Sequence, residues 1–389
     1  MAVYKIFPSK DASIYSEYPL KNTGLDAMNE VRNIQSIVTG SKTVDGVSVA
    51  SVVSRFLVQF DQTDIDYVFD NIVGNAQNQV DLRSYIATAE GVGQNSKLEI
   101  FPVAETWVNG TGQYLDSPQT KDGVTWSKRN ATTKWTSGSF GTYVTASYFS
   151  TEIGGGVWYT GSTDPNLVLP STQSFDIKTT KDLNTDVTNI VKTWYSESKG
   201  VNPYTAIDNN GFIVKWTGSI EYSSDINVAP DLKFYSSDTY TIYPPELDIK
   251  WVDYDYSSGS RSIISTPELF MSLDENPGVF YPESITRFRV NCRPKYPVRV
   301  YQTASIYTEN FLLPTSSYYA IKDLDTNEYV IDFDETYTQI SADGDSSYFT
   351  VYMNGLEPER YYQILIKTTV NDTVIVYKDN NFNFKIQNG

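Results

Sequence analysis

The 389-residue chain contains no histidine, and this limits the chemistry that its other reactive side chains could perform. Without an imidazole there is no Ser-His-Asp or Cys-His nucleophile, no histidine-ligated zinc and no histidine acid–base catalysis near neutral pH. The single cysteine, Cys292, stands in a strand-like run beside Val290, which indicates a small core residue. An enzyme with this sequence would have to use carboxylates, lysines or tyrosines.

One acidic stretch, "DLDTNEYVIDFD", has part of the spacing of an EF-hand calcium loop. Four residues fall at ligand positions 1, 3, 5 and 12 of such a loop: Asp323, Asp325, Asn327 and Asp334. Position 6, however, is Glu328, where the sharp turn of the loop requires glycine. We therefore interpret the stretch as a polar hairpin tip, with its turn at Asp325-Thr326-Asn327.

Other acidic groups are too numerous for any pair to stand out. The chain has 47 Asp and Glu residues, so some pair will always have the spacing of a glycosidase dyad. Asp253 with Asp255, and Asp343 with Asp345, could hold calcium, but Asp is also a usual turn residue. No motif selects a catalytic pair, and we expect the protein not to be an enzyme.

The seven tryptophans offer a different chemistry, because an exposed indole can stack on a sugar ring. Trp126, Trp135 and Trp158 lie in loop-like sequence and are the candidate carbohydrate-binding residues. Packing beneath the loops is the interpretation we favour, since large aromatic side chains are usually buried. Trp194 and Trp216 lie in apolar patterns that predict core positions.

The elements that would position these residues are nearly all strands. Alternating runs such as "RFLVQF", "KLEIFPV", "GFIVKW" and "DLKFY" precede residue 243, and further runs follow it. The exception is "DVTNIVKTWYS", Asp186 to Ser196, where Val187, Ile190, Val191 and Trp194 share one face of a predicted helix. Asp186 is the expected N-cap of that helix, and Ile190 and Trp194 are expected in the core.

A proline pair in "TIYPPELDIKW" marks the clearest boundary. Pro244 and Pro245 cannot donate ladder hydrogen bonds and hold the chain extended. We predict one domain over residues 1–243, a linker over 244–246 and a second domain over 247–389. The second domain carries several strands separated by turn residues, which indicates a sandwich of immunoglobulin or fibronectin type.

The net charge and the hydropathy of the chain limit the classes of partner that it could bind. The formal net charge of −17 disfavours binding to nucleic acid, and the sequence has no long apolar run that would span a membrane. The start, "MAVYKIFPSKDASIY", does not read as a signal peptide. We therefore expect synthesis in a cytoplasm. The 30 tyrosines suit strands and protein interfaces alike.

The order of signals in residues 1–243 resembles the DNRLRE-type domain, a jelly roll similar to carbohydrate-binding modules. The matching runs, in order, are "KDASIYSEYPLKNTG", "SRFLVQFDQTDID", "DLRSYIATAEG", "KLEIFPVAETWVNGTG", "DGVTWSKRN", "DVTNIVKTWYS", "NNGFIVKW" and "APDLKFY". The resemblance implies an all-β fold, with a jelly-roll sandwich capped at one end by one short helix. It also implies no cofactor beyond a structural calcium ion, for which Asp11 and Asn22 are the positions.

The C-terminal part looks like the β-rich end of tailed-bacteriophage virion proteins, in "NPGVFYPESITRFRVNCRPKYPVRVY" and "YFTVYMNGLEPERYYQILIK". These resemblances together predict a structural component of a phage particle, in the neck, tail, baseplate or head. It would be made in the host cytoplasm, bind other virion proteins and form a homo-oligomer in the particle. The alternative is an adhesin module that binds a host-surface glycan. A carboxylate-based polysaccharide-degrading enzyme is a third hypothesis.

Overall fold

In the computed structural model β-strands predominate over helices, and only a few short helices lie between the strands. This confirms the all-β class. The structure describes residues 2–37, 43–44, 47–93, 96–136, 143–144, 154–161, 167–175, 178, 180–201, 207–221, 223, 230–296 and 310–388.

The chain divides into two compact units. Unit 1 consists of Met1–Lys5, Asn75–Asn78 and Ile249–Gly389, and unit 2 consists of Ile6–Gly74 and Gln79–Asp248. The expected boundary at Pro244-Pro245 lies close to the division after Asp248. Two short segments from the first part of the chain nevertheless belong to unit 1. Independent folding of the two halves stays a prediction.

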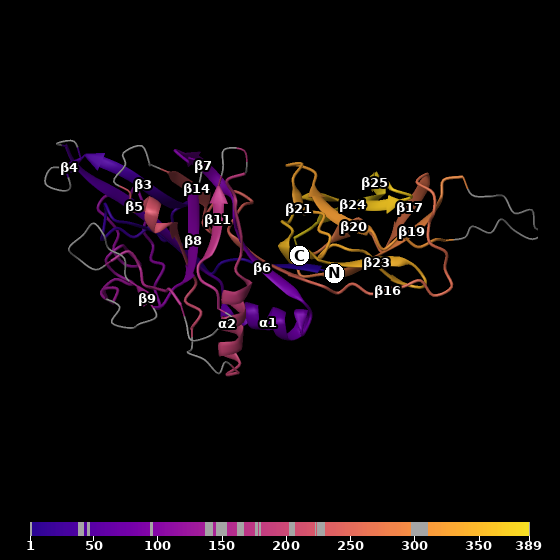
Figure 1. Ribbon diagram of the computed structural model, residues 1–389, viewed down its shortest axis with the longest axis horizontal. Coiled ribbons are helices and arrows are strands. Elements are labelled where there is room, and N and C mark those ends of the chain that lie inside the picture. Colours follow the sequence, from indigo (N-terminus) through magenta and orange to yellow (C-terminus); the bar gives the residue numbers. More distant parts are fainter. Residues whose placement is uncertain are drawn as a thin grey trace, which may run out of the picture. The chain divides into compact units, whose positions relative to one another are not determined.

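Unit 2 is built on a nine-stranded sheet around one long strand, β5 (Figure 1). The sheet path is β11 (Ser171–Phe175), β8 (Ser96–Pro102), β13 (Phe212–Trp216), β5 (Val47–Gln59), β3 (Met28–Ile37), β14 (Asp231–Tyr235) and β7 (Ile86–Glu90). Off this path, β5 also pairs with β2 (Lys10–Tyr15) and β4 (Thr43–Val44). The first half of β5 pairs with β3 and β4, and its second half with β2 and β13.

Two smaller pairings also lie in unit 2. β9 (Tyr143–Val144) pairs with β10 (Trp158–Tyr159), and β12 (Leu183–Asp186) pairs with the second part of β6 (Asn78–Ser84). All of these pairings are antiparallel.

The centre of the nine-stranded sheet is buried on both faces. Phe56, Leu57 and Val58 of β5 are each 0% exposed, and every residue of β13 is buried. One face packs against a tryptophan-rich cluster to which the segment from Val103 to Trp158 contributes many residues. Chain that reads as extended loop therefore acts as a second layer of the fold.

The predicted helix is confirmed as α2, but it runs from Thr188 to Ser198. Its N-cap is Val187, so the assignment of Asp186 as N-cap is wrong by one residue. The Asp186 carboxylate instead accepts a hydrogen bond from the Thr188 backbone N–H at 2.9 Å, in the turn before the helix. The Trp194 ring lies 4.7 Å from the ring of Phe212, so α2 covers the start of β13.

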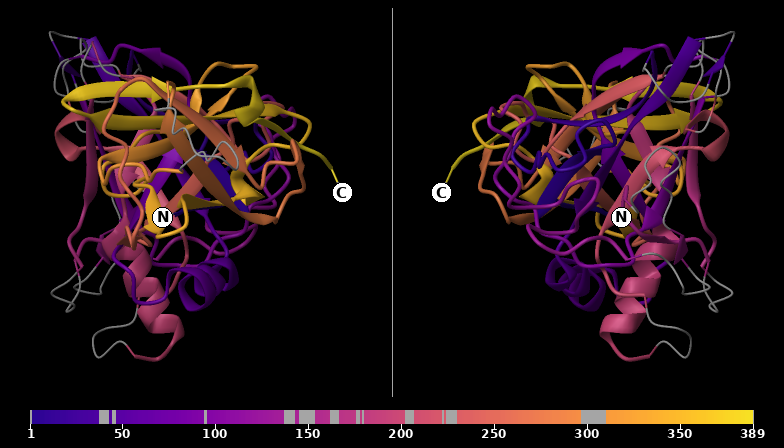
Figure 2. Two further views of the ribbon diagram at one scale, coloured as in Figure 1. Left: turned by 90° about the vertical axis from the view of Figure 1, so that its right-hand side faces the viewer. Right: turned by 90° about the vertical axis from the view of Figure 1, so that its left-hand side faces the viewer.

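The expectation of a single helix is wrong. Within the described residues, the structure contains two further α-helices, α1 (Gln62–Val68) and the one-turn α3 (Gly218–Glu221). α1 continues into a π-helical turn, Phe69–Val73, and lies beside α2 (Figure 2). The rings of Phe69 and Tyr195 stack at 4.9 Å, and the Lys199 ammonium lies 2.7 Å from the Asp70 carboxylate.

Unit 1 is a sandwich of two sheets. One sheet has the order β16 (Tyr256–Ser257), β22 (Ser341–Asp343), β23 (Ser347–Tyr352), β19 (Ile285–Pro294) and β17 (Leu269–Asp274). The other has the order β18 (Val279–Phe280), β26 (Asn383–Ile386), β24 (Tyr361–Val370), β20 (Ser317–Asp323) and β21 (Tyr329–Ile331), and β25 (Thr373–Tyr377) also pairs with β24. The rings of Tyr319 and Phe349 stack at 4.3 Å between the sheets.

The first residues of the chain pack into unit 1. Val3, from β1 (Ala2–Ile6), joins the core of the sandwich, and the Tyr4 ring lies 5.9 Å from the Tyr352 ring. The Asn354 side-chain amide donates to the carbonyl of Lys5 at 2.6 Å. The C-terminal sandwich is therefore completed by the N-terminus.

Candidate functional site

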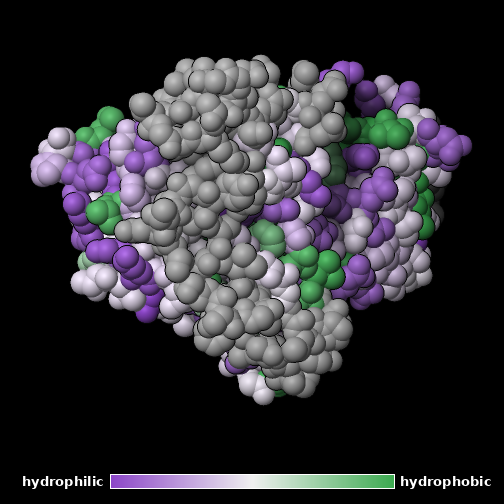
Figure 3. Space-filling view, turned by 60° about the vertical axis from the view of Figure 1, so that its left-hand side comes forward, coloured by the Kyte–Doolittle hydropathy of each residue, from purple (hydrophilic) through white to green (hydrophobic). Residues whose placement is uncertain are grey.

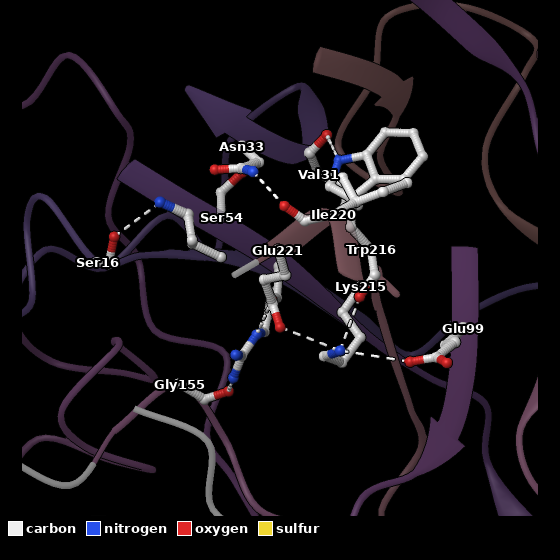
Figure 4. A network of polar contacts seen from close by, with 12 residues as sticks. Ser16, Val31, Asn33, Ser54, Glu99, Gly155, Lys215, Trp216, Ile220 and Glu221 are labelled. Carbon is white, nitrogen blue, oxygen red and sulfur yellow. Dashed lines mark hydrogen bonds and ion pairs between the residues drawn. The ribbon is translucent and has the colours of Figure 1, made fainter. Parts of the chain in front are cut away.

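Three charged side chains are buried together inside unit 2 and form its most distinctive polar feature. This buried charge cluster consists of Arg55 on β5, Lys215 on β13 and Glu221 on α3 (Figure 4). Arg55 Nε lies 2.6 Å from Glu221 Oε1, and Lys215 Nζ lies 3.0 Å from Glu221 Oε2. The exposed fractions of the three side chains are 1%, 4% and 0%.

The Arg55 guanidinium is enclosed by aromatic rings and backbone. It lies 4.8 Å from the Trp126 ring and 5.0 Å from the Trp158 ring, within cation–π range. Its NH1 donates to the carbonyl of Gly155 at 2.5 Å. A Cβ at residue 155 would lie 2.5 Å from this NH1, and φ is +86°, so only glycine fits there.

The electrostatics of the cluster favour a structural role. Burial opposes ionisation of Glu221, but Arg55 and Lys215 more than offset it and lower the pKa of Glu221 below its ordinary value. The carboxylate therefore stays charged at neutral pH and has no proton to donate. Lys215 also lies 3.5 Å from the partly exposed Glu99. The cluster joins two strands and a helical turn. Its positive and negative side chains form ion pairs with one another.

A second acidic group lies on neighbouring strands of the same sheet. Asp231 on β14 lies opposite Arg32 on β3, and Lys233 lies opposite Glu30. Burial, together with the negative charge of Glu30, raises the pKa of Asp231 to about 6. Glu30 is itself held by Arg32 at 3.5 Å and by Lys233 at 3.9 Å. The Asp231 carboxyl, beside Glu30, is therefore a group of unit 2 that changes charge between pH 5 and 7.

The two residues expected at a calcium site belong to separate hydrogen-bonded networks. Asp11 is 1% exposed and accepts hydrogen bonds from Asn29 at 2.7 Å and from the backbone and hydroxyl of Ser237 at 2.8 and 2.6 Å. Burial raises the pKa of Asp11 to about 6. In the part of the chain that the structure describes, no cluster of three His, Cys, Asp or Glu side chains could hold a metal.

Asn22 joins two loops of unit 2. Its amide nitrogen donates to the carbonyls of Asn109 and Val124 at 2.6 and 2.8 Å, and its oxygen accepts from the Gly112 backbone N–H at 2.8 Å. A side chain used in this way is a structural link between the loops.

The three candidate sugar-binding tryptophans are buried. Trp126, Trp135 and Trp158 are 2%, 2% and 3% exposed and belong to the cluster that covers the sheet. Stacking on a sugar needs an open ring face, which these residues do not present. The predicted core residues Trp194, Trp216 and Ile190 are buried at 1%, 0% and 0%.

The EF-hand-like stretch forms the predicted hairpin tip between β20 and β21. The Asp323 carboxylate accepts from the backbone N–H groups of Asp325 and Thr326 at 2.7 and 3.1 Å. Arg360 adds two side-chain hydrogen bonds to the same carboxylate at 2.6 and 2.8 Å. Asn327 has a φ of +66°, which suits a turn.

The outer face of the five-stranded sheet in unit 1 carries a different combination. This arginine–aromatic face consists of Phe270, Ile285, Arg287, Arg289, Arg293 and Tyr348. The Arg287 guanidinium lies 4.7 Å from the Tyr348 ring, and that of Arg293 lies 4.9 Å from the Phe270 ring. Arg289 pairs with Asp343 at 2.8 Å, and the hydrogen bond from Arg289 lowers the pKa of Asp343 to about 2.

Two of these arginines form no ion pair with a described residue. Among the described residues, no carboxylate lies within 4 Å of Arg287 or Arg293. The sequence signal for this face is the strand "RFRVNCR", where three arginines and Asn291 alternate with Phe288, Val290 and Cys292 of the core. Three arginines within one seven-residue run give the pattern of an ordinary amphipathic strand, so the sequence alone does not assign this face.

On the face that Figure 3 shows, the hydrophobic side chains of the described residues occur in small patches separated by hydrophilic ones. Among the described residues, no helix is both long enough and apolar enough to cross a membrane. Comparison with known proteins finds no match: no family model, no curated protein and no solved structure matches this chain.

Proposed function

We propose that this protein is a non-enzymatic structural component of a phage virion that works by protein–protein assembly. The observation that carries the proposal is the arginine–aromatic face. Arg and the aromatic residues are enriched at the energetic centres of protein interfaces. Here they stand on a rigid sheet, with two guanidiniums that have no carboxylate partner among the described residues. The partner that fits is a protein surface bearing carboxylates.

The buried polar groups support assembly over catalysis. The buried charge cluster holds its carboxylate ionised and enclosed, and the Asp323 carboxylate is bound by Arg360 and backbone N–H groups. A general acid or base needs a proton that can move to or from a substrate. These groups instead hold strands and turns together.

The tryptophans proposed for the carbohydrate-binding alternative are buried. An adhesin module of this kind would need an exposed aromatic platform, and the indoles proposed for it lie beneath the loops. Binding to a glycan array by the purified chain would restore that alternative.

The experiment is incorporation into particles, measured by quantitative mass spectrometry of purified virions. We expect the wild-type chain to be present, and the variant Arg287→Glu/Arg293→Glu to be reduced at least about tenfold, because it places like charges against the partner. The matched control is Lys121→Glu/Lys192→Glu, which makes the same charge change at exposed positions of unit 2. Equal incorporation of both variants would remove the arginine–aromatic face from the proposal. Absence of the wild-type chain from particles would remove the proposal itself.

A further inference from the structure

Strand β25 (Thr373–Tyr377) forms part of an edge of the six-stranded sheet in unit 1 and is unusually apolar for an edge. It pairs with β24 only, among the strands of the described chain. Val374 and Val376 are 60% and 51% exposed, and the strand "TVIVY" contains no charge, proline or glycine. Edge strands usually carry charged residues or proline, because an edge without such protection can pair with a strand of another chain.

The strand is firmly held by its own unit. A two-residue turn with φ values of +47° at Asn371 and +60° at Asp372, typical of a type I′ hairpin, connects it to β24. The hydroxyl of Tyr377 donates to the carbonyl of Met271 at 3.2 Å, and its ring lies 5.6 Å from the Phe382 ring. The edge is therefore a preformed template for another strand.

The sequence around this edge is nearly symmetric about Ile375. In an antiparallel pair of two identical strands centred there, Ile375 faces its own copy and Val374 faces Val376 of the second chain. Thr373 then faces Tyr377. The flanking charges match as well, because Asp372 faces Lys378 on both sides of the centre. Both are exposed, and neither makes an ion pair within the described chain.

We propose that two copies of this protein pair through β25, antiparallel and about a two-fold axis that passes beside Ile375. β-Branched residues then meet across the strands on both faces, which stabilises cross-strand pairs. A parallel arrangement would set Asp372 against Asp372 and Lys378 against Lys378, so the charges select the antiparallel one. The contact is isologous, as a closed dimer requires.

This contact deepens the proposed assembly role by naming one self-interface, but its test uses purified protein. Its failure is therefore separate from a failure of the virion proposal. Five paired residues bury less than the roughly 1,000 Å² of a stable interface. We expect a weak dimer that depends on concentration.

The register is tested by disulfide crosslinking of two exposed substitutions, Val374→Cys and Val376→Cys. Directly opposite residues are close enough for a disulfide, whereas a residue and its own copy two positions along the ladder are beyond its reach. A mixture of the two variants should crosslink under mild oxidation at least about fivefold more than either alone. The native Cys292 is buried and does not compete.

The control mixture pairs Val374→Cys with Glu335→Cys, which lies beyond the opposite edge strand, β21. Crosslinking that is absent from the Val374→Cys/Val376→Cys mixture, or equal in the single variants or the control, would overturn the proposed pairing.

A second test reverses the flanking charges and measures dimer formation by sedimentation equilibrium. Asp372→Lys and Lys378→Asp each create two like-charge pairs and should weaken the dimer about tenfold, and the double variant should restore it. Glu335→Lys is the control for net charge. Melting temperatures establish that each variant is folded. A double variant no better than the single ones, or a wild-type chain that stays monomeric at the highest concentration, would contradict the proposal.

Discussion

Arg55 and Glu221 form an ion pair 2.6 Å long in the interior of unit 2, where their side chains are 1% and 0% exposed. The pair joins the central strand of the sheet to a helical turn 166 residues later in the chain. Lys215 and the rings of Trp126 and Trp158 complete its surroundings. Burial of charge is costly, so such a pair is stable only while every partner remains.

We expect Glu221→Gln to lower the free energy of unfolding of unit 2 by about 3–5 kcal/mol, because it leaves Arg55 and Lys215 buried without a counter-charge. Chemical denaturation is the measurement. Glu99→Gln is the control: this residue contacts Lys215 from a partly exposed position, so its loss should cost less than about 1 kcal/mol. A Glu221→Gln variant as stable as wild type would show that the cluster does not hold the fold.

Trp194 is expected to be a core residue whose indole nitrogen contributes little. Truncation to alanine should cost about 3–5 kcal/mol, the usual range for a buried Trp. Its Nε1 has no hydrogen-bond partner among the described residues, so Trp194→Phe should cost only about 1–2 kcal/mol. Thermal melting compares the two. A melting temperature of Trp194→Ala within a degree or two of wild type would mean that α2 is not packed on β13.

Removal of residues 2–5 should loosen unit 1 and leave unit 2 intact. The deletion takes away the buried Val3, the Tyr4 ring and the carbonyl that binds Asn354, for a loss of about 2–4 kcal/mol. Hydrogen exchange should become faster in peptides from 249–389, with peptides from β5 as the internal control. By the same reasoning, the fragment 247–389 should be less stable alone than in the whole chain. Unchanged exchange in unit 1 would contradict this packing.

Asp231 should make unit 2 less stable as the pH rises. Its folded pKa of about 6 lies above the ordinary value of 3.8, so the folded state binds more protons between these values and stability falls through that window. Asp231→Asn keeps a neutral group that can donate to Glu30. We expect it to gain about 1 kcal/mol at pH 7.5, a figure reduced for partial solvent exposure, and clearly less at pH 4.5, where the carboxyl of the folded wild type is still protonated.

The pH measurement is thermal melting of the Asp231→Asn variant and wild type across this range. The exposed Asp208→Asn serves as control for the loss of one charge in unit 2. Equal melting temperatures of the Asp231→Asn variant and wild type at both pH values would mean that the carboxyl is not perturbed by its site.

Sequence reasoning succeeded where the determinants are local. The apolar stripe of α2 and the hairpin tip at Asp323 both follow from residues within one turn or two of each other. It failed for α1, which has seven residues, two of them buried, and an Asp61 N-cap that makes no side-chain hydrogen bond. A helix that short has almost no periodic signal.

The candidate sites were harder to predict because their parts are distant in sequence. The buried charge cluster forms only when β5 and β13 pair, which brings Arg55 close to Lys215 and Glu221. The sequence around each of these residues contains no pattern that predicts contact with the other two. The tryptophans stand in chain that reads as loop, yet that chain covers a sheet buried on both faces. Likewise, no local pattern assigns Val3 to the core of a sandwich formed by residues after 249.

The central claim is assembly through the arginine–aromatic face, and the most direct measurement is a reconstruction of the purified phage particle in which this chain is located. We predict a neighbouring protein that covers Arg287, Arg293 and Tyr348, with carboxylates opposite the two guanidiniums. A chain found in the particle with this face open to solvent, or a chain missing from particles altogether, would contradict it.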